Sequence, residues 1–228
     1  QDVKAFQIAA RFSHAAEETR FFNASCTKTR FFSVFFKKIG NGRRKKRMNG
    51  KEKTTLMDET AMARAIMRIS HEIIERNKNA DDVALIGIVT RGAPLARKIR
   101  DDIQKICGKR VETGYADITL YRDDLSEISD MPEVKKTDVS FSVKDKNVIL
   151  CDDVLYTGRT ARAAMGAVLA LGRPKTIQLA VLIDRGHREL PIRADYAGKN
   201  IPTSLNEVIA VKFTETDGEE CVKLFESD

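Results

Sequence analysis

Residues 148–160 read VILCDDVLYTGRT, and this stretch decides the fold. An apolar run leads directly into two adjacent acids, Asp152 and Asp153, and then into the small polar turn Thr157–Thr160. A continuous apolar run of this length is typical of a parallel strand that is buried on both faces. Open α/β sheets bind ligands beyond the carboxyl ends of their strands, so we expect the acids and the turn to face a ligand.

The flanking sequence alternates between strand-like and helix-like patterns. Asp58 is a plausible N-cap for a helix whose apolar residues recur at helical spacing. The predicted elements are helix Asp58–Asn77, strand Val83–Val89, helix Pro94–Ile106, strand Asn147–Leu150, helix Thr160–Leu171 and strand Thr176–Ile183. Tyr121–Asp145 is polar and indicates a long loop, and in the irregular tail Val208–Phe213 indicates one further strand. This order predicts an α/β fold, with a mainly parallel central sheet flanked by helices.

The positive charge of the chain is confined to its first 47 residues. The 228 residues carry a net charge of +7, but residues 1–47 hold 12 Lys and Arg against 3 Asp and Glu, and residues 48–228 hold 28 against 30. Such a segment could be a basic arm or a transit peptide. The run Gly42–Arg47 before Met48 could also be a translated ribosome-binding site. We therefore expect residues 1–47 to be an extension without a site, and residues 48–228 to form one domain.

Other features narrow the class of protein. No apolar stretch approaches the roughly 20 residues that cross a bilayer, so we expect no membrane partner. The four cysteines are scattered, without a CxxC pair, which favours a reducing, cytoplasmic location. A GxxxxGK[ST] phosphate loop is absent, which argues against a P-loop nucleotidase.

Two strand ends carry residue types that suit a sugar phosphate. The turn Thr157–Thr160 offers hydroxyl groups and free backbone N–H groups at a helix start, which suit a phosphomonoester. Asp152 and Asp153, just upstream, suit the hydroxyl groups of a ribose, which donate hydrogen bonds to carboxylates. Thr90–Gly92 follows the preceding predicted strand and forms a second loop of this kind.

Residues 148–160 resemble the phosphoribosyl-pyrophosphate (PRPP) signature of type I phosphoribosyltransferases, in which two acids precede a T-G-x-T turn. Three further stretches, Ile118–Leu125, Arg185–Tyr196 and Gly198–Thr203, narrow this resemblance to the PyrR family of pyrimidine-operon attenuators and uracil phosphoribosyltransferases. The likeness extends from about Met57 to the C-terminus. It implies the type I phosphoribosyltransferase fold, with a small hood and a flexible loop beside the central sheet.

The resemblance implies that uracil displaces pyrophosphate from PRPP to give UMP, with Mg²⁺ carried by PRPP and no metal held by protein side chains alone. It implies catalytic roles for Asp152, Asp153 and Arg122. It places uracil beside Ile183, Asp184 and Arg185. The implied PRPP and UMP contacts are Thr90, Arg91, Gly92, Asp152, Asp153, Val154, Leu155, Tyr156, Thr157, Gly158, Arg159 and Thr160. The family's pyrophosphate loop often contains a cis peptide, and the bond in question here is Thr90–Arg91.

The resemblance also implies UMP-dependent binding to the leader of pyr mRNA, which attenuates transcription, and assembly into a homodimer or a larger homo-oligomer. The positions that match RNA contacts are Arg68, His71, Arg76, His187, Arg188, Arg193 and Lys199. Met67 departs from the threonine that RNA-binding relatives can carry. Because residues 48–228 are slightly acidic in sum, an RNA surface would have to be a local basic patch.

Three functions remain open from the sequence. The first is a uracil phosphoribosyltransferase that also binds RNA. The second is a pure regulator that keeps the PRPP site as a nucleotide sensor, or else an enzyme or nucleotide sensor without RNA regulation. The third is a phosphoribosyltransferase for another base, such as hypoxanthine or orotate.

Overall fold

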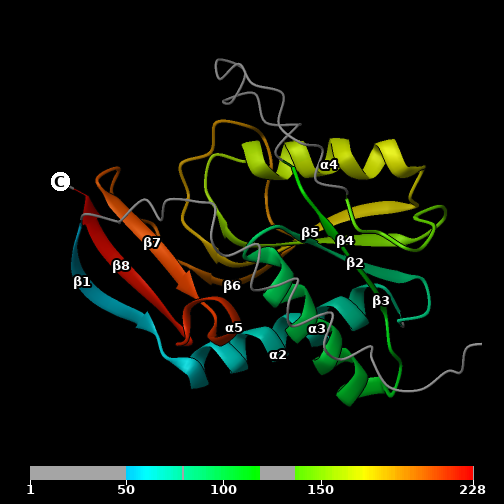
Figure 1. Ribbon diagram of the computed structural model, residues 1–228, viewed down its shortest axis with the longest axis horizontal. Helices are drawn as coiled ribbons and strands as arrows, with labels where there is room; N and C mark the ends of the chain where they lie inside the picture. The colour runs from blue at the N-terminus through cyan, green and yellow to red at the C-terminus, as the bar shows by residue number, and fades with distance from the viewer. Residues whose placement is uncertain (1–49, 79, 119–136, 228) are drawn as a thin grey trace, which may run out of the picture. The chain divides into compact units, whose positions relative to one another are not determined.

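The computed structural model describes residues 50–78, 80–118 and 137–227 (Figure 1). Their centre is a parallel sheet of five strands in the order β3-β2-β4-β5-β6. Its strands are β2 (Val83–Ile88), β3 (Glu112–Ala116), β4 (Asn147–Leu155), β5 (Thr176–Asp184) and β6 (Tyr196–Asn200). The predicted α/β class and parallel sheet are therefore confirmed. The extension 1–47 and residues 119–136, which include Arg122, lie outside the described residues.

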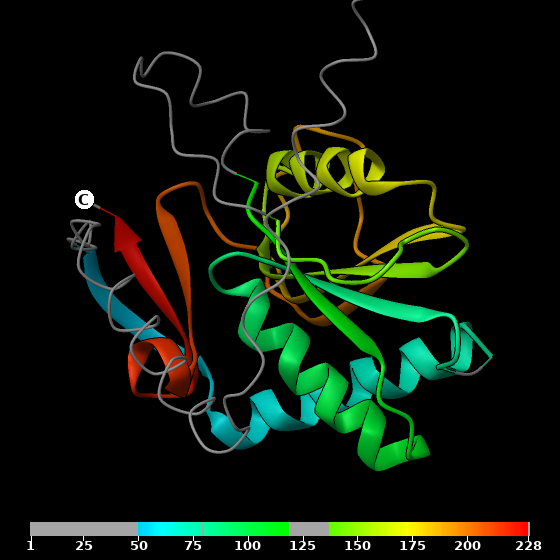
Figure 2. The ribbon, with the colours of Figure 1, turned by 45° about the vertical axis from the view of Figure 1, so that its right-hand side comes forward.

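Helices cover both faces of this sheet (Figure 2). Helices α2 (Glu59–Arg76) and α3 (Gly92–Cys107) pack against one another on one face, and α4 (Arg159–Leu171) lies on the other. Asp58 caps α2 as predicted, since its side chain accepts a hydrogen bond of 2.7 Å from the N–H of Ala61. The α4 helix has no acid in its first turn, so its positive end remains suited to an anion.

A second, antiparallel sheet forms the hood that the family resemblance implied. Its strands lie in the order β1-β8-β7 and are β1 (Gly50–Met57), β8 (Cys221–Ser227) and β7 (Glu207–Lys212). The short helix α5 (Thr214–Asp217) connects β7 to β8. This sheet joins the two ends of the described chain, and Figure 1 shows its three strands together beside α2.

Alternate residues of the central strands feed two separate apolar cores. Leu85 and Ile149 pack toward α2 and α3, in a cluster that also contains Val211 from the hood. Their neighbours Ile86 and Leu150 pack toward α4. Because both faces are covered, the central strands are apolar almost throughout, which is why they were readable in the sequence.

The strand that carries the acids is longer than predicted. We expected it to end at Leu150, but β4 continues to Leu155, and Asp152 pairs with Val181 of β5. Pairing between β2 and β4 ends at Gly87 and Cys151. Asp152 and Asp153 therefore lie within a strand that has lost its neighbour on one side, and that side is occupied by the start of α3.

Candidate functional site

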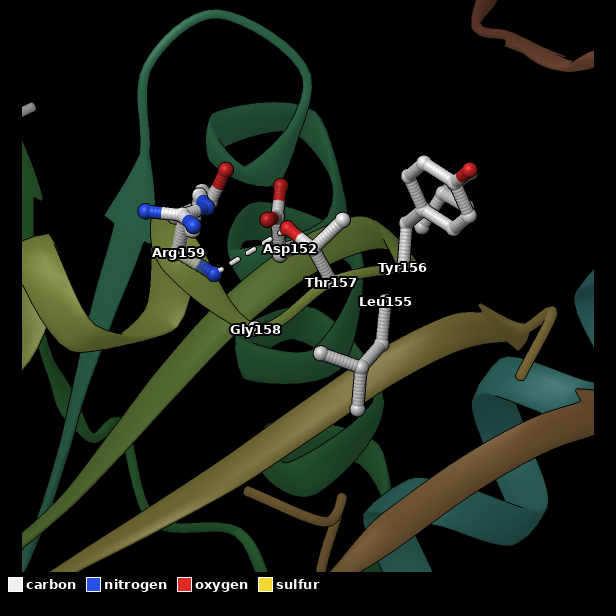
Figure 3. Close-up of a pocket in the computed structure, with 8 residues that line it drawn as sticks. Asp152, Leu155, Tyr156, Thr157, Gly158 and Arg159 are labelled. Carbon is white, nitrogen blue, oxygen red and sulfur yellow. Dashed lines mark hydrogen bonds between the residues drawn. The ribbon is translucent and has the colours of Figure 1, made fainter. Parts of the chain in front are cut away.

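The turn between β4 and α4 forms a cavity of about 290 Å³. Gly158 adopts a left-handed backbone conformation, with φ of +92°, and thereby lets the chain turn sharply into α4. The N–H of Arg159 donates a hydrogen bond of 3.4 Å to Oγ1 of Thr157 (Figure 3). The lining residues were all predicted as PRPP or UMP contacts: Asp152, Val154, Leu155, Tyr156, Thr157, Gly158, Arg159 and Thr160. A concave surface with hydroxyl and backbone donors at a helix start suits a phosphate group.

Asp152 and Asp153 form a partly buried carboxyl pair next to this turn. Oδ1 of Asp152 accepts a hydrogen bond of 3.0 Å from the N–H of Asp153, and Oδ1 of Asp153 accepts one of 2.9 Å from the N–H of Val154. Burial, together with the charge of its neighbour, raises the pKa of Asp152 well above its ordinary value. Burial also raises the pKa of Asp153, but the positive charge of Arg91 opposes this rise. Of the two carboxyl groups, Asp153 is the one on which the Arg91 charge acts.

The loop between β2 and α3 brings Arg91 to the same edge of the sheet. The bond in this loop that is cis is Val89–Thr90, one bond before the position the resemblance suggested. Nη2 of Arg91 lies 3.1 Å from Oδ1 of Asp217 on α5 of the hood. Asp217 was not among the predicted site residues, because 126 positions separate it from Arg91 and no local sequence pattern marks it.

The start of α3 and strand β4 are in direct backbone contact. A Cβ atom at Gly92 would lie 2.1 Å from the carbonyl oxygen of Cys151, the residue immediately before the carboxyl pair. Only glycine allows this approach, so Gly92 serves the packing between α3 and β4. Residues of both segments that are predicted to contact PRPP thus lie at one edge of the sheet.

The residues predicted to lie beside uracil have mainly structural contacts. Ile183 is fully buried in the core. Asp184 forms an ion pair with Arg188. Arg185 is 7% exposed, and its guanidinium donates to Oγ1 of Thr203 at 3.0 Å and to the carbonyl of Glu207 at 2.7 Å. The Arg185 guanidinium also lies 4.1 Å from the ring centre of Tyr156, so this arginine joins the end of β5 to the hood and to the β4–α4 turn.

The predicted RNA contacts fall into two groups. Arg68, His71 and Arg76 lie on α2, which packs beside β6, where Lys199 is located. Contacts across this junction include the bonds from Nη2 of Arg68 to the carbonyls of Ala197 and Gly198, at 2.9 and 2.7 Å. The second group, His187, Arg188 and Arg193, follows β5.

Arg188 belongs largely to the interior of the site rather than to a free surface. Besides pairing with Asp184, it donates to the carbonyls of Tyr156, Gly186 and Ile192 at 2.8, 3.0 and 2.9 Å. Arg193, in contrast, is exposed. The sequence could not distinguish these two arginines, because burial and hydrogen bonding depend on the tertiary fold.

Two further properties concern metals and membranes. In residues 50–78, 80–118 and 137–227, no group of three or more His, Cys, Asp or Glu side chains is arranged to hold a metal ion. Over the same described part of the chain, none of the helices has the length and apolar character needed to span a bilayer.

Comparison with known proteins agrees with this geometry. The family model described as "Phosphoribosyl transferase domain" matches residues 53–216. The hypoxanthine phosphoribosyltransferase of Trypanosoma cruzi has a similar fold, with a TM-score of 0.59 and 16% identity, over 78% of this chain and 98% of that one. The enzyme of the same name from Staphylococcus aureus gives a TM-score of 0.58 at 17% identity, over 77% and 93%. The fold is that of a type I phosphoribosyltransferase.

Curated relatives narrow the family further. A protein of Clostridium botulinum named "Bifunctional protein PyrR" is 62% identical over 175 residues, which are 77% of this chain and 97% of the relative. A protein of the same name from Deinococcus radiodurans is 56% identical over 176 residues, which are 77% and 96% of the two chains. The chain therefore belongs to the PyrR family of phosphoribosyltransferases, as its sequence indicated.

Proposed function

We propose that this protein transfers the phosphoribosyl group of PRPP to N1 of uracil, releasing pyrophosphate and forming UMP. One observation carries the proposal: Asp152, a member of the carboxyl pair, lines the same small cavity at the end of β4 as the turn Thr157–Thr160. A ribose 5′-phosphate needs these two kinds of group side by side. The membership of the PyrR family supports uracil as the base.

The carboxyl pair acts on the ribose. Asp152 and Asp153 accept hydrogen bonds from the ribose hydroxyl groups, while Thr157, Thr160 and the start of α4 bind the 5′-phosphate. Positive charge develops on the sugar ring as pyrophosphate leaves. Asp153, whose ionised form Arg91 favours, stabilises that charge. Fixed charges placed where charge develops usually make the largest contribution to catalysis.

The β2–α3 loop acts on the leaving group. Arg91 and the backbone N–H groups at the start of α3 bind pyrophosphate. Mg²⁺ bound to PRPP would neutralise part of the pyrophosphate charge, and the oxygen-rich pair Asp152 and Asp153 fits a sugar that arrives with this ion. Arg122 remains the predicted residue that covers pyrophosphate and excludes water.

In this proposal, uracil binds beside the end of β5. Asp184 and Arg185 are each engaged with other protein groups, so they shape the base site through the segments they hold. Arg185 does so by holding the carbonyl of Glu207, the first residue of β7 in the hood.

A panel of bases tests this function. The protein is incubated with PRPP and Mg²⁺ and with uracil, hypoxanthine or orotate, and nucleotide formation is followed by chromatography. We expect turnover with uracil alone. Turnover with another base would replace uracil in the proposal. If the protein binds UMP but turns over none of the bases, it is a nucleotide sensor and the proposed activity is wrong.

RNA binding is the second proposed function, with UMP promoting attachment to the leader of pyr mRNA in the cytoplasm. The junction of α2 and β6 supports it, because Arg68, Arg76 and Lys199 come from elements that pack side by side. The exposed Arg193 extends this basic surface. Arg188 supports the surface indirectly, because its hydrogen bonds hold the segment that follows β5.

A gel-shift series in rising KCl tests the RNA surface. The logarithm of affinity should fall against the logarithm of salt by about 0.7 per phosphate contact on single-stranded RNA, so Arg193→Gln should lower the slope by about that amount. Arg173→Gln is the control. Arg173 is exposed, but it precedes the N-terminal end of β5, whereas the second group of predicted RNA contacts follows the C-terminal end of that strand. Binding that ignores salt or UMP would contradict the proposal.

A further inference from the structure

Three ion pairs connect the hood to the loop and helix that follow β2. Arg91, Arg97 and Lys98 lie at or near the start of α3, and they pair with Asp217, Glu215 and Glu220 of the hood. The partners come from α5 and from the residues just before β8. This part of the hood is therefore fixed to the segment that we assign to pyrophosphate.

Asp217 differs from the other two acids because its partner belongs to the proposed ligand site. The Asp217 side chain is 18% exposed, and that of Arg91 is 37% exposed. Oδ2 of Asp217 accepts hydrogen bonds from Oγ1 of Thr216 at 2.7 Å and from the N–H of Phe213 at 3.3 Å. Oδ1 is directed to Arg91 at 3.1 Å. The hood thus sets the orientation of the carboxylate independently of Arg91.

The electrostatics connect Asp217 to the sugar site through Arg91. Burial opposes the ionisation of Asp217, but the Thr216 hydroxyl, the Arg91 charge and the Phe213 N–H together leave its pKa below the ordinary value. The same Arg91 charge acts on Asp153. One guanidinium therefore serves a carboxylate of the hood and a carboxylate of the central sheet.

We infer that Asp217 is a positioning residue for the pyrophosphate group of PRPP: it holds the Arg91 guanidinium at the start of α3, where the leaving group binds. The inference rests on the proposed function. A guanidinium has five N–H donors, so a bond to Asp217 through Nη2 leaves donors for phosphate oxygens. Without Asp217, Arg91 would have to be ordered by the ligand itself, and this ordering would reduce affinity.

Asp217→Asn tests the inference, because it removes the charge and nearly preserves the shape. Isothermal titration of Mg²⁺–pyrophosphate should give a Kd about tenfold higher than for the natural protein, the size of one lost charge-assisted hydrogen bond. The KM for PRPP should rise by a similar factor with kcat nearly constant. The Kd for UMP, which has no pyrophosphate group, should change less than about twofold. Asp217→Glu should restore part of the loss.

Glu215→Gln is the matched control. It removes an ion pair between the same two elements, that with Arg97, without touching Arg91. Pyrophosphate and UMP should bind this variant as they bind the natural protein. A double-mutant cycle adds a second test: with Arg91→Gln already present, Asp217→Asn should have no further effect on pyrophosphate binding.

The outcomes separate this inference from the proposed function. If the natural protein makes UMP but Asp217→Asn binds pyrophosphate unchanged or more tightly, the positioning role is wrong and the enzyme stands. Equal weakening of UMP, or additive effects in the cycle, would mean that Asp217 only supports the fold. If the natural protein neither binds nor consumes PRPP, it is the proposed function that fails.

Discussion

The two loops at the ligand edge of the sheet are organised in opposite ways. The end of β4 and the loop into α4 hold the carboxyl pair, the turn and the helix start within one contiguous stretch, Asp152–Thr160. The β2–α3 loop is short, and its main charged side chain, Arg91, is held by an acid of the distant hood. The first loop carries its own chemistry, whereas the second depends on tertiary structure. A change at Asp217 of the hood should therefore reach the pyrophosphate side and spare the phosphate side.

The largest effect should come from a side chain placed in the close backbone contact between Gly92 and Cys151. Gly92→Ala would place Cβ 2.1 Å from the carbonyl oxygen of Cys151, and backbone atoms cannot move aside cheaply. We expect a loss of at least about 3 kcal/mol in the free energy of unfolding, measured with urea. Gly108→Ala is the control: it meets no atom within 4 Å, and with φ of +72° it should cost only about 1–2 kcal/mol. Equal losses in the two variants would show that the contact is unimportant.

The next effect concerns the chemistry of the self-contained loop. Asp153→Asn removes the charge that faces the developing positive ring, so kcat should fall on the order of 100- to 1000-fold. UMP should still bind, because the phosphate turn is unchanged. Asp82→Asn, an exposed acid just before β2, should leave kcat unaltered. Steady-state kinetics and UMP titration measure both, and full activity in Asp153→Asn would remove the carboxyl pair from the mechanism.

The smallest effect is a gain in stability. Because burial and the charge of Asp153 raise the pKa of Asp152, the folded state binds more protons than the unfolded state above the ordinary aspartate pKa. Stability is then complete below that value and is lost as pH rises through the raised pKa. Asp152→Asn avoids this loss, so at pH 7 its Tm should exceed that of the natural protein by about 2–4 °C, as for about 1 kcal/mol in a chain of this length.

Calorimetry between pH 4 and pH 8 distinguishes this cause from a general packing effect. The Tm difference should shrink as pH falls toward the ordinary aspartate range. A difference of constant size at every pH would contradict the ionisation argument. Gains of this kind at an active site, obtained at the expense of turnover, are a known consequence of burying charge for function.

The sequence predicted the central sheet better than the hood, for a physical reason. Central strands such as β2 are covered on both faces, so they read as unbroken apolar runs. The strands β1, β3, β6 and β8 are short or half exposed, and they were not predicted from the sequence. The predicted end of β4, Leu150, was also too early. Two adjacent acids usually indicate the end of a buried strand, and the sequence does not show that β2 stops pairing with β4 at Cys151 and so leaves room for them.

The site residues also differ in how well the sequence predicts them. The residues that line the cavity were all among the predicted PRPP contacts, because one contiguous motif contains them. The roles of Arg185 and Arg188 could not be predicted, since both are defined by carbonyl groups that tertiary folding brings near. Asp217 was missed altogether. Hydrogen bonds between distant segments leave no periodic trace in a sequence.

The glycine at the start of α3 has a consequence for how the site can change. Because no side chain fits between Gly92 and the carbonyl of Cys151, the spacing of the two loops is set by main-chain atoms alone. Mutations elsewhere in either loop can change its charge and shape while this backbone spacing stays the same. Replacing one loop with that of a distant relative, and not the other, would disturb the spacing, so the two loops have to be exchanged together.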